Sequence, residues 1–359
     1  MTLGELSCNC CAASCRFAEL KSLSEATGCV ILGKAEHLNP GLSVKDRAAA
    51  GMLAAAEATG KLTPHSGSGT IIEATGGNTG VSLALMAASR GYTCILTMPD
   101  RISAEKKATM RLFGAQVIEC PSVPFSDSRH FYHAAARLAK ENPSAVWLDQ
   151  FFNDANWRAH YCGTGPEMWS QAGHALDAVA LASGTGGTIG GLSSYLKEVS
   201  PSIAVFLVDP PGSGLKGLLE QGRFVPTPGS TITEGIGTGR HTLNFDVARP
   251  HVDAAVTVRD ADAVQMAHYV LRTEGVFLGP SAAMNVMGAV MAAKTLGPGH
   301  TVATVLCDGG ANHRSTIYND EFLKAHGLSG AAAAGAAGYL PDLDDALQYS
   351  AAHPGTATE

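Results

Sequence analysis

Residues 177–191 read DAVALASGTGGTIGG, an apolar run that leads directly into a glycine-rich turn and then into a helix. Amides freed by the glycines, the partial positive charge of the helix N-terminus and two threonine hydroxyls can together bind a phosphate dianion. A purely structural turn is one alternative. A dinucleotide site is another, but its acidic residue is expected about 20 residues downstream, whereas Asp209 comes somewhat late. A phosphate site and a structural turn therefore both stay open for Gly184, Thr185, Gly186, Gly187 and Thr188, whereas the dinucleotide site is disfavoured.

Apolar runs alternate with alanine-rich helical stretches along the rest of the chain, which is typical of βαβ units around parallel sheets. Glycines such as Gly60, Gly91 and Gly114 follow the helical stretches, where a left-handed residue ends a helix at little cost. With 359 residues and 45% hydrophobic content, the chain can form two domains with ample cores. The expected strands are residues 29–35, 70–74, 93–98, 115–120, 178–182, 203–208 and 301–307.

The charge pattern excludes several classes of partner. The formal net charge is -7, the isoelectric point is about 6.0, and basic residues gather on no predicted helix face. Nothing therefore attracts nucleic acid or an anionic membrane. No apolar run reaches the roughly 20 residues that cross a bilayer, and the first residues lack a signal-peptide pattern. We predict a soluble, cytoplasmic protein with small-molecule partners.

The nine cysteines fall into two groups. Four lie within residues 8–15, in a leader of residues 1–19 that we expect to be mobile. Metal binding there is disfavoured, because a zinc site usually needs two separated ligand pairs and no histidine lies nearby. Histidines elsewhere share no ligand spacing, so we predict no metal site. The other five cysteines lie in apolar segments, where a reduced thiol packs as a small hydrophobic group: Cys29, Cys94, Cys120, Cys162 and Cys307.

A lone lysine opens a predicted helix within residues 39–47, which read NPGLSVKDR. A second glycine-rich turn, residues 73–80 with the sequence EATGGNTG, follows a strand and opens another helix. It offers amides, hydroxyls and a carboxamide without formal charge, which suits the carboxylate of a zwitterionic substrate. The two turns and Lys45 together indicate an amine held near two anion sites.

These motifs occur in the order found in the cysteine synthase family, and on them the chain resembles the β-family of pyridoxal-phosphate enzymes. That family also holds cystathionine β-synthase and cysteine desulfhydrases, and the pattern near residues 234–240 and 306–310 is most similar to the desulfhydrase-type branch. The resemblance extends from about residue 20 to residue 328. The motifs are NPGLSVKDR at 39–47, TGGNTG at 75–80, Gln150-Phe151 with Asn156, GTGGT at 184–188 and EGIG at 234–237.

The resemblance implies an α/β fold of two doubly wound, mostly parallel-sheet domains with the cofactor in the cleft between them. This is the tryptophan synthase β-like arrangement, fold type II. It places an N-terminal domain at residues 20–155 and a C-terminal domain at residues 156–328, and it implies a homodimer. Residues 329–359 begin with a run of alanine and glycine, and we expect this tail to be disordered.

The same resemblance assigns roles to individual residues. Lys45 forms the Schiff base with pyridoxal 5'-phosphate and, once displaced by the substrate amine, removes the α-proton. Asn78 bonds the phenolic oxygen, residues 184–188 hold the phosphate, and the loop around Gly235 lies over the substrate. Where many members carry a serine near the pyridine nitrogen, this chain offers Asp308 or Cys307. We predict that Asp308 either faces that nitrogen or caps the following turn. The α-carboxylate is assigned to Thr75, Gly76, Gly77, Asn78, Thr79 and Gln150.

The implied reaction is a β-replacement through an aminoacrylate, in which O-acetylserine and sulfide give cysteine and acetate. A close alternative is L-cysteine desulfhydrase activity, in which cysteine gives pyruvate, sulfide and ammonia at the same site. The choice depends on how well the closed site excludes water and admits sulfide. A hypothesis from another class is a non-catalytic regulatory protein that keeps the cofactor. Retention of the lysine and of both turns argues against it.

Overall fold

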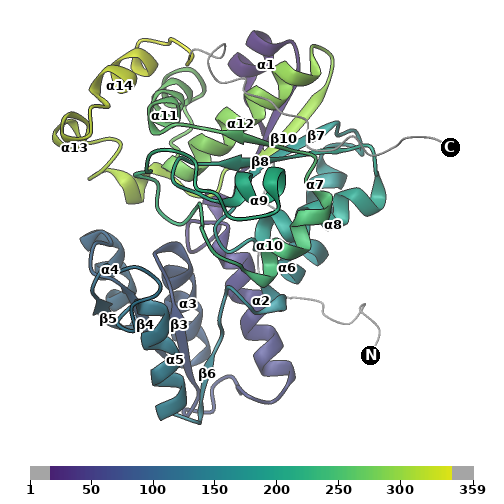
Figure 1. Ribbon diagram of the computed structural model, residues 1–359. Coiled ribbons are helices and arrows are strands. Elements are labelled where there is room, and N and C mark those ends of the chain that lie inside the picture. The colour runs from purple at the N-terminus through teal and green to yellow at the C-terminus, as the bar shows by residue number, and fades with distance from the viewer. Residues whose placement is uncertain (1–16, 342–359) are drawn as a thin grey trace.

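The computed structural model describes residues 17–341, which form two α/β domains, each built on its own sheet (Figure 1). Neighbouring strands are parallel throughout, except for the antiparallel pair of β1 and β2. The predicted α/β architecture with mostly parallel sheets is confirmed. The larger sheet has the order β1 (Phe17–Glu19), β2 (Val30–Lys34), β10 (Thr301–Val305), β7 (Ala178–Ala182), β8 (Ala204–Asp209) and β9 (Ala254–Thr257), and the smaller sheet the order β5 (Gln116–Cys120), β4 (Thr93–Pro99), β3 (Thr70–Ala74) and β6 (Ala145–Trp147).

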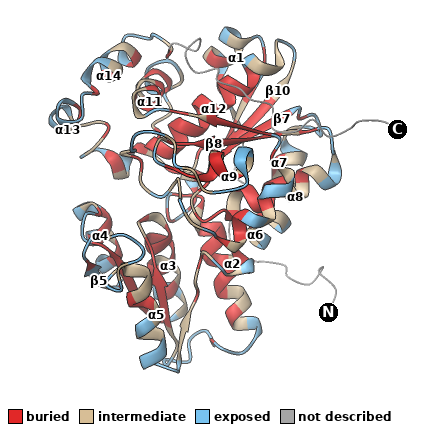
Figure 2. Cartoon of the chain, in the orientation of Figure 1, coloured by how far each residue is buried: buried red, intermediate tan, exposed pale blue. Residues whose placement is uncertain are grey.

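Helices cover both faces of the larger sheet. Successive residues of a strand point to opposite faces, so the apolar run of β7 supplies two cores. Ala178 and Ala180 belong to one core, and Val179 and Leu181 belong to the other. The first core is completed by α1 (Lys21–Thr27), α11 (Asp260–Glu274) and α12 (Pro280–Leu296), which is buried along most of its length (Figure 2). The second is completed by α7 (Gly165–Gln171), α8 (Gly187–Val199), α9 (Leu215–Gln221) and α10 (Leu243–Ala248).

The smaller sheet is covered in the same way. Ile71 of β3 belongs to the core on one face of the sheet, whereas Ile72 belongs to the core on the other face. The first face carries α2 (Lys45–Ala58), α3 (Asn78–Arg90) and α4 (Ala104–Leu112), and the second carries α5 (Phe131–Glu141). Helix α6 (Asp154–Ala159) then returns the chain to the larger domain and packs between α2 and α8.

The domain boundaries differ from the predicted ones. The described part of the chain starts in the larger sheet, where β2 pairs with β10, and it enters the smaller domain only with α2. The predicted N-terminal domain, residues 20–155, therefore includes a strand of the other domain. The predicted disordered tail also begins too early: after α13 (Asp320–Ala325), helix α14 (Ser329–Ala336) packs on α11, where a Cβ on Gly335 would lie 2.2 Å from the Gln265 carbonyl oxygen. Residues 1–16 of the predicted leader, which include the cysteine cluster, and residues 342–359 lie outside the described residues.

A buried ion network joins the start of α2 to the larger domain. Arg47 lies 2.8 Å from Glu36 through Nη2 and 2.6 Å from Glu167 of α7 through Nη1. Lys34, which is fully buried at the end of β2, lies 2.9 Å from the same Glu167. Removing one member would leave its partners charged and buried, which costs more than the pair itself contributes. The network therefore fixes the first turn of α2.

We expect Arg47→Met to lower the free energy of unfolding by about 3 kcal/mol, because Glu36 then stays buried without its main partner. Arg129→Met is the matched control: Arg129 pairs with Asp127 at the surface, where solvent screens the pair, so its loss should leave the free energy of unfolding almost unchanged. Urea denaturation of the full chain measures both variants. Equal losses would contradict a structural role for the network.

Candidate active site

Lys45 is the first residue of α2 and lies beside the end of β10. A short antiparallel bridge joins Ser43 to Asp308, and the Val44 amide donates to the Cys307 carbonyl oxygen over 2.8 Å. Burial lowers the pKa of the Lys45 amine, while nearby Cys307 and Asp308 raise it in part. The amine is therefore easier to deprotonate than that of a free lysine, as a base or nucleophile requires.

Asp308 is a buried carboxylate that three side chains hold in place. Asn78 donates to Oδ2 over 2.9 Å, His313 Nε2 lies 2.8 Å from the same oxygen, and the Ser281 hydroxyl donates to Oδ1 over 3.3 Å. Burial alone would raise the pKa of this carboxyl, but the charge and hydrogen bond of His313 and the bond from Asn78 lower it to about 2. Asp308 is therefore an anion at neutral pH.

These contacts bear on the two predictions made for Asp308. Among the described residues its carboxylate bonds to side chains and not to the backbone of the turn that follows, so the predicted cap is wrong. A Cβ on Gly279 would lie 2.2 Å from Oδ1, so a glycine there leaves the space that the carboxylate fills. Contact with a pyridine nitrogen stays a prediction. Asn78, which was predicted to bond the phenolic oxygen of the cofactor, donates a hydrogen bond to the Asp308 carboxylate.

The predicted phosphate turn follows β7 and begins α8. Gly186 has a φ of 90°, a left-handed conformation that glycine adopts without strain. Within the described chain, no acceptor bonds the backbone N–H groups of Gly184, Thr185 or Gly186, and the buried Ser183 hydroxyl has no partner. Open donors at the N-terminus of a 13-residue helix match the oxygens of a phosphate ester. The turn at residues 184–188 therefore fits the phosphate of a cofactor.

The predicted carboxylate turn lies between β3 and α3. The Thr75 hydroxyl accepts from the amides of Gly77 and Gly80, over 3.1 and 3.2 Å. The Thr79 hydroxyl donates to the Gln150 carboxamide oxygen over 2.7 Å, and the Gln150 amide donates to the backbone of β3. The structure thus places Gln150 beside this turn, to which the family resemblance linked it as a carboxylate-binding residue.

The loop that carries Gly235 packs directly on the phosphate turn. The Gly237 amide donates to the Ser183 carbonyl oxygen over 2.7 Å, and a Cβ on Gly184 would lie 2.0 Å from the Gly235 carbonyl oxygen. Gly184 is therefore required for this close approach. A Cβ on Gly235 or on Gly76 would meet no other atom within 4 Å, so both glycines border open space.

Sequence reasoning missed Lys106, a buried cation beside the carboxylate turn. Its ammonium nitrogen lies 2.6 Å from Glu234 Oε2, and a Cβ on Gly77 would lie 3.4 Å from that nitrogen. Lys106 belongs to α4 of the smaller domain, whereas Glu234 belongs to a loop of the larger domain, so the ion pair joins the two. No signal marked Lys106, because α4 reads AEKKATMRL, like an ordinary surface helix. Nothing in the sequence indicated that His313 bonds Asp308, apart from the spacing of five residues between them.

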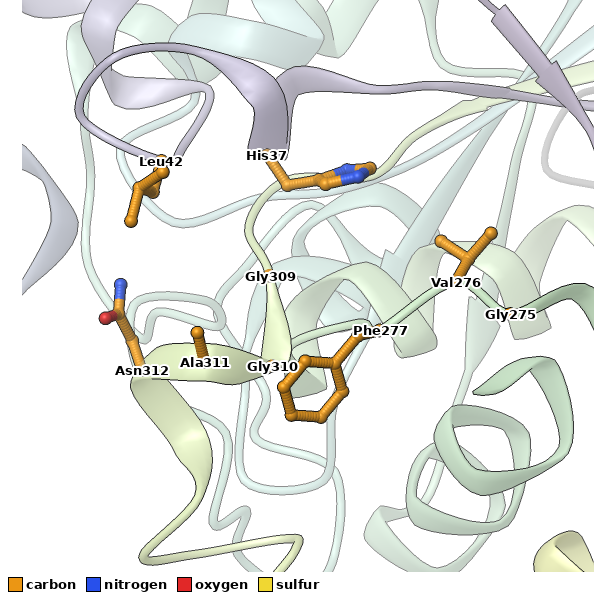
Figure 3. A pocket seen from close by; sticks show the side chains of 9 residues that line it. All are labelled: His37, Leu42, Gly275, Val276, Phe277, Gly309, Gly310, Ala311 and Asn312. Carbon is orange, nitrogen blue, oxygen red and sulfur yellow. The ribbon is translucent and has the colours of Figure 1, made fainter. Parts of the chain in front are cut away.

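A cavity of about 300 Å³ lies next to the end of β10 and does not include Lys45 (Figure 3). It borders the site through Gly309, which directly follows Asp308. The ring of His37 contributes a buried Nδ1 atom without a partner in the described chain. The cavity is lined by His37, Leu42, Gly275, Val276, Phe277, Gly309, Gly310, Ala311 and Asn312.

Residues 17–341 contain no group of three or more His, Cys, Asp or Glu side chains placed to hold a metal ion. No helix in this part of the chain is long and apolar enough to cross a membrane. Its cysteines are free thiols. Cys29, Cys94 and Cys120 are buried as expected, whereas Cys162 is exposed, so the prediction of a packed thiol is wrong there.

The fold and the site define a class of protein: an α/β enzyme that holds a phosphorylated cofactor beside a reactive lysine, where two domains meet. The family model for pyridoxal-phosphate dependent enzymes matches residues 16–308 of the chain. The chain belongs to this family, and pyridoxal phosphate is its cofactor.

Relatives with curated names are similar over most of their length. Cysteine synthase 2 of Schizosaccharomyces pombe is 44% identical over 326 residues, which cover 86% of this chain and 82% of the relative. Cysteine synthase 1 of Neurospora crassa is 45% identical over 314 residues, which cover 87% of this chain and 83% of the relative. The crystal structure of an O-acetylserine dependent cystathionine β-synthase from Helicobacter pylori matches with a TM-score of 0.74 and 32% identity, covering 81% of this chain and 91% of that one.

We expect borohydride reduction of the holoenzyme to fix the cofactor on Lys45, because this amine combines partial burial with a lowered pKa. Peptide mapping by mass spectrometry identifies the modified residue. Lys45→Ala should give no adduct at that position, and Lys61→Ala, which changes an exposed lysine, should leave the adduct unchanged. An adduct on another lysine in the wild-type protein would refute the assignment.

The ionisation of Asp308 predicts a pH dependence of stability. Its pKa is depressed from 3.8 to about 2 on folding, so its contribution is present above pH 4 and is lost as the pH falls toward 2. We expect the difference in unfolding free energy between wild type and Asp308→Asn to shrink by about 1 kcal/mol between pH 5 and pH 3. Denaturation of both proteins across this range measures it, and a constant difference would rule the depressed pKa out.

Proposed function

We propose that this chain is a cysteine synthase, which replaces the acetoxy group of O-acetyl-L-serine by sulfide and releases cysteine and acetate. The observation that carries the proposal is the position of Lys45. Its amine has a lowered pKa and lies near the Asp308 anion, to which Asn78 of the carboxylate turn donates a hydrogen bond. Lys45 also acts electrostatically on His160, whose Nε2 lies 3.4 Å from the Thr188 hydroxyl of the phosphate turn. The cysteine synthases to which the chain is 44% and 45% identical support the same reaction.

Pyridoxal phosphate, when bound, supplies an electron sink that stabilises negative charge at the α-carbon of an amino acid. The amides of residues 184–188 would hold its phosphate, Lys45 its carbonyl carbon, and Asn78 its ring oxygen. The Thr79–Gln150 pair would orient the substrate α-carboxylate. The substrate amine would replace Lys45 on the cofactor, and the released lysine amine would then be free to take the α-proton.

Burial and one neighbouring group help Lys45 to act as that base. Burial lowers the pKa of its amine, so the neutral form that accepts a proton is accessible. The Asp308 carboxylate, which is ionised, acts electrostatically on the same amine and stabilises the charge that Lys45 acquires with the proton. The same arrangement would serve β-elimination, so L-cysteine desulfhydrase activity is the second candidate.

The small-molecule partners in this proposal are an amino acid and sulfide. A homodimer and a cytoplasmic location stay predictions from the sequence.

Two assays run side by side on the holoenzyme test the proposal. We expect cysteine formation from O-acetylserine and sulfide to exceed pyruvate formation from cysteine. Lys45→Ala should lower the first rate by about 1,000-fold, because it removes the general base. The exposed-lysine variant Lys61→Ala is the control and should keep the wild-type rate. Faster pyruvate formation would identify a desulfhydrase, and neither product with cofactor bound would identify a non-catalytic protein.

A further inference from the structure

Arg240 has an uncommon environment for a charged residue. Its guanidinium carbon lies 4.2 Å from the ring centre of Phe125, 4.4 Å from that of Phe151 and 4.9 Å from that of Tyr132. We call these three rings the aromatic cage. No atom of residues 17–341 accepts a hydrogen bond from the guanidinium, and its Nη1 is buried. The rings therefore hold the cation while its N–H donors stay unused.

This arrangement is costly unless an anion completes it. Burial lowers the pKa of Arg240, while Tyr132 and Asp149 raise it in part. Asp149 does not bond the guanidinium but accepts the Tyr132 hydroxyl over 3.1 Å. Cation–π contacts use none of the guanidinium N–H donors, whereas a planar carboxylate binds a guanidinium by two parallel hydrogen bonds. The caged guanidinium is therefore suited to a small anion.

The neighbouring ring of His130 adds no positive charge that would repel Arg240. Burial, followed by the charge of Arg240, lowers the pKa of His130 to about 4, so the imidazole is neutral at physiological pH. Arg101 also acts on His130 in the same direction. The groups whose charges act on this cluster are Arg240, Arg101 and His133, together with the carboxyls of Asp149 and Glu73.

The aromatic cage lies next to the carboxylate turn. Phe151 directly follows Gln150, whose carbonyl oxygen accepts a bond from Asn244 over 2.8 Å. The side chain of Gln150 bonds the turn, whereas that of Phe151 lies under Arg240. The ring beneath Arg240 thus belongs to the chain neighbour of a residue assigned to the α-carboxylate.

We propose that Arg240 binds a second carboxylate of the substrates, one that lies beyond the β-carbon of the amino acid. The proposal rests on the proposed function and names its substrate class. The carboxylate belongs either to the acyl leaving group or to an incoming thiol, and both present the same planar anion to the guanidinium. An acetyl ester and hydrosulfide carry no such group and do not use Arg240.

The test compares pairs of substrates that differ in one carboxylate, with the holoenzyme and the variant Arg240→Met. O-succinyl-L-serine against O-acetyl-L-serine, each with sulfide, examines the leaving group. Mercaptoacetate against 2-mercaptoethanol, each with O-acetyl-L-serine, examines the thiol. Arg158→Met is the matched control, because Arg158 also lies over an aromatic ring, that of Trp157, but is exposed and paired with Asp154.

We expect Arg240→Met to lower the preference for the charged member of at least one pair by about 10- to 100-fold in kcat/KM, the worth of a charge-assisted hydrogen bond. In the same variant, kcat/KM for O-acetyl-L-serine with sulfide should change by less than about twofold, because the introduced methionine still packs in the aromatic cage. Arg240→Lys should recover only part of the preference, since a lysine lacks the planar fork. Arg158→Met should behave as wild type.

Unchanged preferences in both pairs would overturn the proposal. Isothermal titration of succinate against succinamide gives a readout that does not depend on turnover, and Arg240→Met should weaken succinate binding alone. If the wild-type protein fails to convert O-acetyl-L-serine, the proposed function falls, and this titration still decides the role of Arg240. Equal succinate binding by wild type and Arg240→Met would overturn it independently.

Discussion

The backbone bridge between Ser43 and Asp308 is the constraint on which the site depends. β2 and β10 are adjacent parallel strands, so the segments that leave their carboxyl ends start side by side. One segment leads into α2 and carries Lys45, and the other gives Cys307 and Asp308. The bond of 2.8 Å from the Val44 amide to the Cys307 carbonyl oxygen fixes their register. The lysine is thus placed by strand pairing rather than by contacts of its own side chain.

Buried charges from both domains balance one another around this bridge. The larger domain supplies Asp308 with His313 as its partner, and Lys106 of the smaller domain pairs with Glu234 of the larger. An unpaired buried charge costs several kcal/mol, so each of these groups needs its counterpart in place. The ionisation of Lys45 therefore depends on how the two domains are held together, because Asp308 acts on its amine directly.

Local sequence was sufficient for the parts of the site that are local. Each glycine-rich turn follows its own strand, and composition alone marks both, as it marks the lysine that opens α2. Strands β1, β6 and β9 were missed, because runs of three or four residues have no clear period. The partners of the site were missed for another reason: Asn78 meets Asp308 across 230 residues, and Lys106 meets Glu234 across 128. Strand β2 was assigned to the wrong domain because its partner strand, β10, lies near the other end of the described chain.

One loop connects these separately positioned parts. Its first contact is the ion pair of Glu234 with the buried Lys106 of α4, and Gly237 then bonds the residue before the phosphate turn. Arg240 follows in the aromatic cage. At the far end, Asn244 donates to the backbone carbonyl of Gln150. Both of its ends are fixed by polar bonds, and its middle is fixed by rings. A change in the middle of this loop can alter what the site admits without moving Lys45, which depends on the bridge to β10. Chemistry and selectivity are therefore carried by different segments, which lets one scaffold serve several substrates.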